Sequence, residues 1–187
     1  MIMKKLSKIV VASLVVSGST FIHAAGGQGQ GSGQVKFHGY IIDAPCSIVS
    51  DDPILVDFGQ ISNRVLADGG KSHVEPFEIE LADCDLTGLN PGNVAVTFSY
   101  TGATATQGGT PSTNLIGFDG VPAAGAGVAI VSGGVQATNG QPLPVQLLQT
   151  GPNTLEFSSY VQGLGGPLNT IEIGEFYANA NFQLSYN

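Results

Sequence analysis

Tryptophan is absent from the chain, and histidine and the basic residues are scarce. Of the six Lys and Arg residues, three lie within the first eight positions. The other three stand against 14 acidic residues, so residues 25–187 carry a net charge of −11. Such an acidic chain is a poor partner for nucleic acid or for an anionic membrane surface. The charge favours solubility, and pairing with a basic partner is the alternative.

The shortage of histidine argues against catalysis. Beyond the first 24 residues only His38 and His73 remain, and neither stands in a motif that sets a base beside a nucleophile. The Gly-rich stretch over residues 26–33 lacks the spacing and the lysine of a phosphate-binding loop. We therefore expect no enzyme, no cofactor and no metal site.

One acidic cluster resembles the start of a calcium loop. Asp83, Asp85 and Thr87 stand at alternate positions, but the glutamate due at the twelfth position is Val94. A polar turn after a strand is the expected interpretation, and calcium binding is the minor alternative.

The first 24 residues predict a Sec-type signal peptide. They have a basic start, an apolar run over residues 9–16 that is too short to span a bilayer, and small residues before Ala24. We expect cleavage after Ala24 and no membrane insertion afterwards; serines in and after the apolar run disfavour a retained anchor. Export exposes the two cysteines, Cys46 and Cys84, to an oxidising compartment, so a disulfide is expected and a metal site is the weaker alternative.

Long helices are not predicted, because no stretch keeps a 3.6-residue apolar period and 27 glycines and 10 prolines interrupt the chain. Short strand-like runs are frequent instead. They cover residues 54–59, 74–84, 93–100, 114–118, 127–132, 144–149, 155–162 and 175–186. With the region 35–49, their number is that of an immunoglobulin-like β-sandwich. The missing tryptophan and the early cysteine pair exclude an antibody-type domain.

The last of these runs has one wholly apolar face. That face is formed by Phe176, Ala178, Ala180, Phe182, Leu184 and Tyr186. No sequence follows Asn187 to supply a further strand, and the two central alanines leave room for something to lie against them. We expect this strand to lack a neighbour on one side.

A second strand-like segment stands at the other end of the mature chain. Its apolar positions Val35, Phe37, Gly39 and Ile41 alternate with polar ones, and it follows a tether of Gly, Gln and Ser. We expect this strand to pair with another molecule. Two alternatives stay open: Gly39 marks a β-bulge, or Ile41 belongs to the first strand of the domain.

Three features together identify the chain as similar to fimbrial (pilus) subunits of the bacterial chaperone–usher pathway, especially the major-rod subunits of P-type and type 1 pili. They are the tethered strand "GQVKFHGYIIDAPCSI", the cysteine pair with its "IELADCDL" context, and the terminal "GEFYANANFQLSYN". The resemblance covers residues 25–187. It implies an incomplete immunoglobulin-like β-sandwich that lacks its last strand, over residues 42–187, with an N-terminal donor-strand extension over residues 25–41.

The resemblance also implies roles for single residues. Val35, Phe37, Gly39 and Ile41 would be the donor residues, with Gly39 at a shallow spot in the neighbour's groove. A second set would form the acceptor groove and be recognised by the chaperone: Gly174, Phe176, Ala178, Ala180, Phe182, Leu184, Tyr186 and Asn187. The Cys46–Cys84 disulfide would tie the first strand to the core.

The implied function is that of a structural subunit of an adhesive fimbria on the bacterial surface, exported through the periplasm. Its expected partners are identical or related subunits, a periplasmic chaperone and an outer-membrane usher. The alternatives are a minor subunit, such as an adaptor or rod terminator, and a self-contained secreted immunoglobulin-like binding module.

Overall fold

The computed structural model describes residues 33–89, 92–104, 109–119 and 125–187. The predicted signal peptide and most of the predicted tether lie outside them. The chain divides into two units, Met1–Ile41 and Ile42–Asn187, which are considered separately. No helix in the described residues has the length and apolarity needed to cross a membrane.

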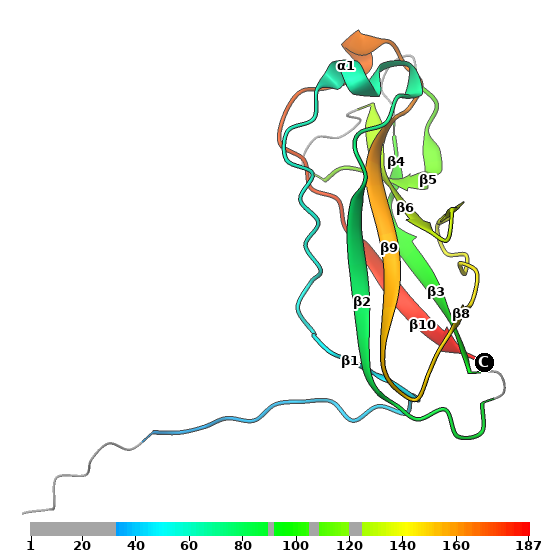
Figure 1. Ribbon diagram of the computed structural model, residues 1–187. Coiled ribbons are helices and arrows are strands. Elements are labelled where there is room, and N and C mark those ends of the chain that lie inside the picture. Colours follow the sequence, from blue (N-terminus) through cyan, green and yellow to red (C-terminus); the bar gives the residue numbers. More distant parts are fainter. Residues whose placement is uncertain (1–32, 90–91, 105–108, 120–124) are drawn as a thin grey trace, which may run out of the picture. The chain divides into compact units, whose positions relative to one another are not determined.

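The second unit consists mainly of strands, drawn in Figure 1. In chain order the elements are β1 (Ser47–Ile48), α1 (Asn63–Leu66), the 3-10 turn η1 (Ala67–Gly69), β2 (Glu75–Cys84), β3 (Asn93–Tyr100), β4 (Gly102–Ala103), β5 (Ser112–Ile116), β6 (Ala126–Ser132), β7 (Val135–Gln136), β8 (Gln146–Leu147), β9 (Gly151–Gly163), the 3-10 turn η2 (Leu168–Thr170) and β10 (Ala180–Tyr186).

Two antiparallel sheets are formed. The larger has the order β1-β2-β9-β6-β5-β4, with β7 attached to β6, and the smaller has the order β10-β3-β8. The β10–β3 pairing runs without interruption from Ala180 opposite Tyr100 to Tyr186 opposite Val94. Within the described residues β10 has β3 as its only strand neighbour, and its other edge is open.

The core lies between the two sheets. Alternate residues of β2 and β9 face inward, such as Ile79 and Leu155, and meet Val96 of β3. Three aromatic rings tie the sheets together: Phe157 stacks on Phe77 at 5.2 Å between ring centroids and meets Phe98 edge-on at 5.4 Å. Burying a side chain of this size contributes about 1.5–3 kcal/mol. The prediction of an all-β, immunoglobulin-like fold is confirmed.

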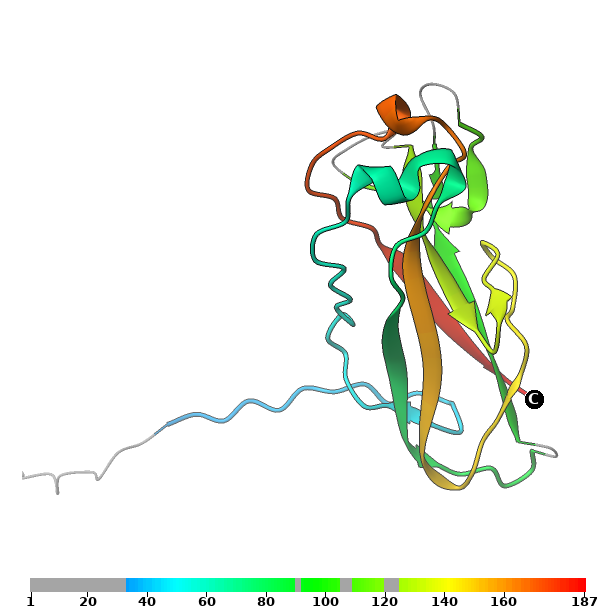
Figure 2. The same cartoon turned by 45° about the horizontal axis from the view of Figure 1, so that its top comes forward.

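One end of the sandwich is covered by α1, η1 and η2, which come forward in Figure 2. Ser62 caps α1, its hydroxyl accepting a hydrogen bond from the backbone N–H of Arg64. The end of β9 packs closely beneath, since a Cβ at Gly163 would lie 1.8 Å from the carbonyl oxygen of Leu66. A residue with a side chain therefore does not fit there.

Some predicted strands differ from the observed ones. Residues 54–59 contain no strand, and the run 175–186 is a strand only from Ala180, although Tyr177 forms an isolated bridge with Asp119. The run 114–118 corresponds to β5, which begins and ends two residues earlier, and only Gln146–Leu147 of the run 144–149 is a strand. Residues 35–41 also form no strand. An alternating pattern becomes a strand only where a partner backbone is present to pair with it.

The predicted disulfide is confirmed: Cys46 and Cys84 are bonded and buried, with their Cα atoms 4.1 Å apart. The bond fixes the chain just before β1 to the end of β2. It therefore holds the beginning of the domain against the larger sheet.

Loss of this disulfide is expected to lower stability. Replacing both cysteines by serine should reduce the free energy of unfolding by up to about 4 kcal/mol, because closing the chain between residues 46 and 84 restricts the unfolded ensemble. Guanidinium unfolding followed by circular dichroism measures the change. Reductant should destabilise the parent chain and leave the double variant unaffected; equal stability of the two chains would contradict this role.

Candidate functional site

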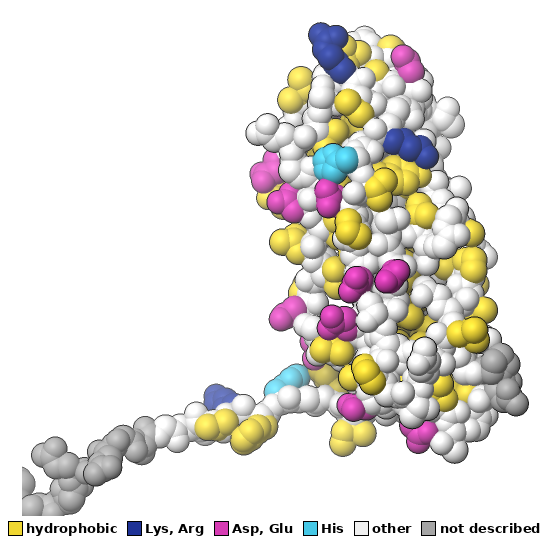
Figure 3. Space-filling view, viewed as in Figure 1, with side chains coloured by type: hydrophobic (Ala, Val, Ile, Leu, Met, Phe, Trp, Pro, Cys, Tyr) yellow, Lys and Arg dark blue, Asp and Glu magenta, His cyan; other side chains and the backbone are white. Residues whose placement is uncertain are grey.

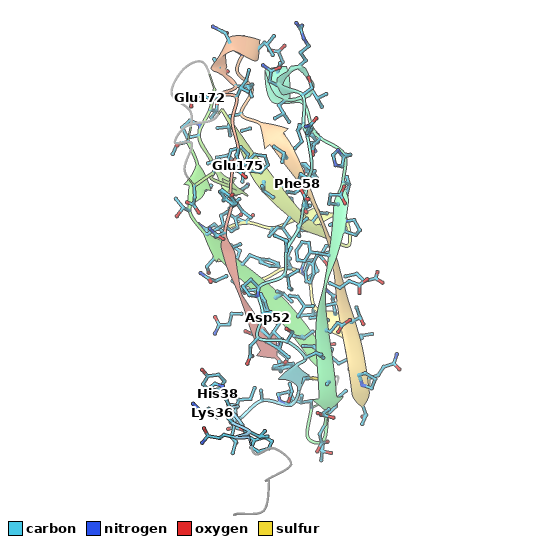
Figure 4. The ribbon with its side chains drawn as sticks, turned by 90° about the vertical axis from the view of Figure 1, so that its left-hand side faces the viewer. Lys36, His38, Asp52, Phe58, Glu172 and Glu175 are labelled. Atoms are coloured by element: carbon cyan, nitrogen blue, oxygen red, sulfur yellow. A yellow bond between two sulfur atoms is a disulfide. The ribbon has the colours of Figure 1, made fainter. Side chains whose placement is uncertain are left out.

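A groove of about 890 Å³ lies between segment 48–58 and segment 176–182. Figure 4 looks onto this side, where Asp52 and Phe58 of the lining are labelled. The groove lies along the open edge of β10, of which Ala180, Asn181 and Phe182 are part of the lining.

The floor of the groove is the hydrophobic core itself. It is formed by side chains from both sheets, namely Phe77, Ile79, Phe98, Ile116, Val128 and Ile130. Because both sheets contribute, an apolar side chain inserted here enters the space between them. This position is the one that a further strand beside β10 would occupy in a complete sandwich.

The β10 side of the groove follows the predicted alternation. Phe176, Ala178, Ala180 and Phe182 are half-buried and line the groove, while Tyr177 and the residues between them are exposed. The two alanines stand at the centre of this wall. Their small side chains leave the floor accessible from outside.

Backbone groups along the outer edge of β10 are also without a strand partner among the described residues. Since β10 pairs only with β3 among the described strands, the N–H and C=O groups along its other edge are available to a further strand. An extended segment placed in the groove would gain both main-chain hydrogen bonds and apolar contacts, which is the arrangement of β-augmentation.

The resemblance implies a groove flanked by the first and last strands, but the residues of the wall opposite β10 were not predicted. Segment 48–58 carries Ile54, Leu55 and Val56 along the groove and ends at Phe58, which is buried. Leu55 is 91% exposed, unusual for a leucine in a folded domain. The signal that could have located this wall was the strand-like run 54–59, whose alternation has no partner strand within the domain.

An aromatic cluster closes one end of the groove. Phe176 stacks on Phe118 with 4.2 Å between ring centroids, and it lies 6.4 Å from Phe58. Beside this cluster, Glu175 raises the pKa of Tyr177 through a hydrogen bond and through its negative charge. The cluster links the end of segment 48–58 to the start of segment 176–182.

The remaining predicted residues are Leu184, assigned to the groove wall, and Gly174, Tyr186 and Asn187, assigned to recognition by the chaperone. Leu184 and Tyr186 are half-buried against the core and do not line the groove, and burial raises the pKa of Tyr186. Gly174 is exposed before β10. Asn187 exchanges two backbone hydrogen bonds with Asn93, of 3.0 and 3.1 Å, which fix the end of β10 to the start of β3.

The residues predicted to form the donor strand belong to the first unit and are considered alone. Val35, Phe37 and Ile41 are exposed, Phe37 by 92%, in a segment without helix or strand. A Cβ built at Gly39 meets nothing within 4 Å. The segment therefore presents three large apolar side chains at alternate positions, with a gap at Gly39.

The acidic turn after β2 has a local structural role. Oδ1 of Asp85 accepts hydrogen bonds from the backbone N–H and the hydroxyl of Thr87, at 3.0 and 2.6 Å. These bonds lower the pKa of Asp85. The carboxylate closes a turn, as expected of a polar turn after a strand.

Comparison with known proteins identifies the family. The family model described as "Fimbrial protein" matches residues 35–187. The chain belongs to the fimbrial protein family. It is 39% identical over 188 residues to the Fimbria A protein of Serratia marcescens, covering 97% of this chain and 99% of the relative. It is 32% identical over 170 residues to the Pap fimbrial major pilin protein of Escherichia coli, covering 84% and 85%.

Solved structures agree. The chain is similar to the P pilus rod subunit PapA, with a TM-score of 0.64 and 28% identity, covering 77% of this chain and 100% of the other. It is also similar to a subunit in a chaperone–usher pilus structure, with a TM-score of 0.69 and 28% identity, covering 84% and 97%. The protein is thus a subunit of a chaperone–usher type fimbria, located on the cell surface after export through the periplasm. Its relatives are structural pilins and not enzymes.

Filling the groove from its β10 wall should abolish its capacity for apolar ligands. Ala180→Phe places a ring where a small side chain now leaves the floor accessible, so binding of an apolar fluorescent dye to the folded subunit should fall strongly. Gln183→Phe, on the exposed face of the same strand, is the matched control and should bind dye like the parent. Equal dye binding by the two variants would show that the apolar site lies elsewhere.

Proposed function

We propose that this fimbrial subunit polymerises by donor-strand exchange, in which residues 35–41 of one subunit occupy the groove of the next. In that arrangement Val35, Phe37, Gly39 and Ile41 face the floor of the neighbour's groove. Every subunit then offers one donor and one acceptor. Repeated pairing builds the fimbria from identical or related subunits.

The observation that carries the proposal is the match between the groove and the donor segment. The groove has an unpaired strand edge and an apolar floor, and the donor segment has exposed apolar side chains at strand spacing and no strand partner among residues 33–41 that the structure describes. Burying the three large donor side chains would contribute about 1.5–3 kcal/mol each. Main-chain hydrogen bonds to β10 would add to this.

The direction of the donor follows from head-to-tail stacking. The domain begins at Ile42, shortly before β1, and the aromatic cluster of Phe58 and Phe176 lies at the other end of the groove, where Figure 4 labels Phe58. A neighbour stacked beyond that far end would thread its donor from Ile41 at the cluster to Val35 beside Ile48. The donor would then run antiparallel to β10, as neighbouring strands of this sandwich do.

The same groove explains the need for delivery partners. An open apolar groove beside an unpaired strand edge promotes aggregation. A periplasmic chaperone would cover the groove with a strand of its own until an outer-membrane usher brings the next donor. In the residue roles implied by the resemblance, Gly174, Tyr186 and Asn187 belong to the surface that the chaperone recognises.

The open groove also bears on the choice of subunit type. A rod terminator would keep its donor strand and lack an open groove, and a self-contained binding module would supply its own last strand. The groove therefore favours a subunit that accepts a further neighbour, as a major-rod subunit does.

Production in the periplasm tests the proposal. The mature chain should accumulate as a soluble species only when a cognate chaperone is produced with it, because the groove needs a strand. Deletion of residues 25–41 should leave chaperone binding intact and abolish insertion into a neighbour. A soluble, stable monomer without any chaperone would refute donor-strand exchange.

The glycine of the donor should be sensitive to size. Gly39→Leu adds a side chain on the face that enters the groove, so polymerisation should slow by at least about tenfold, the equivalent of about 1.4 kcal/mol. The matched control Tyr40→Leu changes the adjacent residue on the opposite face and should polymerise at nearly the parent rate. Formation of SDS-resistant ladders over time measures both, and equal rates would remove the special role of Gly39.

A further inference from the structure

Charge is divided unevenly between the donor and the domain. All 14 acidic residues lie at position 43 or beyond. The same part of the chain contains two basic residues, Arg64 and Lys71. Residues 25–42 contain no acidic residue and one basic residue, Lys36. The donor region is therefore positive and the domain strongly negative.

The groove carries a share of this negative charge. Asp51, Asp52, Glu78 and Glu80 are exposed along it, and its lining includes no Lys, Arg or His. Asp52 is labelled in Figure 4 beside the lower half of β10, and acidic side chains gather along the β2 side of the face drawn in Figure 3. Glu78 stands directly opposite Glu156 in the β2–β9 register, a like-charge pair that a nearby cation would relieve.

These carboxylates have no cation of their own. Among the described residues the ion pair found is His73 with Glu75, at 3.0 Å, outside the groove lining. Both Asp51 and Asp52 are therefore free to pair with a charge brought by another molecule.

We infer that Lys36 of the incoming donor pairs with Asp51 and Asp52 of the acceptor groove, and that this pairing speeds and orients donor insertion. The inference rests on the proposed function. With Val35 near Ile48, Lys36 enters the end of the groove whose lining carries Asp51 and Asp52. The alternation of the donor directs Lys36 away from the floor, toward the rim where these carboxylates are exposed.

The pairing acts while two subunits approach each other, before the donor is inserted. Two strongly acidic domains repel each other, whereas a positive donor and an acidic groove attract, and such steering raises association rates and weakens with salt. An exposed ion pair adds little to final stability. We therefore expect the pairing to make the polymerisation rate depend on salt and to leave the stability of the assembled fibre nearly unchanged.

The test measures the polymerisation rate of full-length mature subunits, purified as chaperone complexes, at about 0.02 M and about 1 M salt. Lys36→Glu should polymerise about fivefold to tenfold more slowly than the parent at low salt, and nearly equally at high salt, where the Debye length is about 3 Å. Arg64→Glu, an exposed change of the same charge on α1, is the matched control and should remain within about twofold of the parent.

The decisive test is a variant in which the charges of the inferred pair are exchanged within one chain. Because each subunit is both donor and acceptor, Lys36→Glu combined with Asp51→Lys and Asp52→Lys should recover the parent rate at low salt. Failure of this triple variant to recover, or an equal effect of Lys36→Glu and Arg64→Glu, would overturn the pairing.

One further variant separates this inference from the proposal beneath it. Phe37→Asp places a charge on the face that enters the groove and should abolish polymerisation at every salt concentration. If Phe37→Asp blocks assembly while Lys36→Glu has no effect, donor-strand exchange stands and the ion pair is refuted. If Phe37→Asp assembles normally, both are refuted.

Discussion

The open edge of β10 is the constraint on which the rest of the structure depends. A sandwich buries its apolar faces by completing both sheets, and here the smaller sheet stops at β10 while the core continues beneath the missing position. The apolar side chains that should be covered become the floor of a groove. The disulfide before β1 and the aromatic cluster around Phe176 fix the two ends of this opening.

The missing strand beside β10 makes the stability of the subunit depend on its assembly. A domain that lacks one strand can cover its apolar groove only with a strand from another chain. Binding of that strand in the proposed assembly would add to the free energy that stabilises the fold. The donor segment has the complementary property: it is too short and too exposed to bury its own apolar residues. In the proposed donor-strand exchange, pairing between copies would complete both parts of the chain. In the inferred pairing, the acidic groove and Lys36 of the donor would be complementary in charge as well as in shape.

Much of this could be predicted from the sequence. The alternation over residues 176–186 gave the correct apolar face, since the period of two is set by backbone geometry and needs no tertiary knowledge. The disulfide followed from the cysteine count and the expected compartment. The residues of the wall formed by segment 48–58 were not predicted, because a strand-like run implies pairing, and the position of Ile54 and Leu55 along the groove depends on the three-dimensional fold. The exclusion of Leu184 and Tyr186 from the groove also depends on three-dimensional position, because the groove ends before the strand does.

Amide hydrogen exchange of residues 35–41, compared between the chaperone-bound subunit and the assembled fimbria, tests the central claim most directly. Donor-strand exchange predicts rapid exchange of these amides in the chaperone-bound subunit and strong protection in the fimbria, because the donor backbone becomes hydrogen-bonded to β10 of the neighbour. Rapid exchange of residues 35–41 in intact fimbriae would contradict it, since the groove would then be filled by something other than this segment.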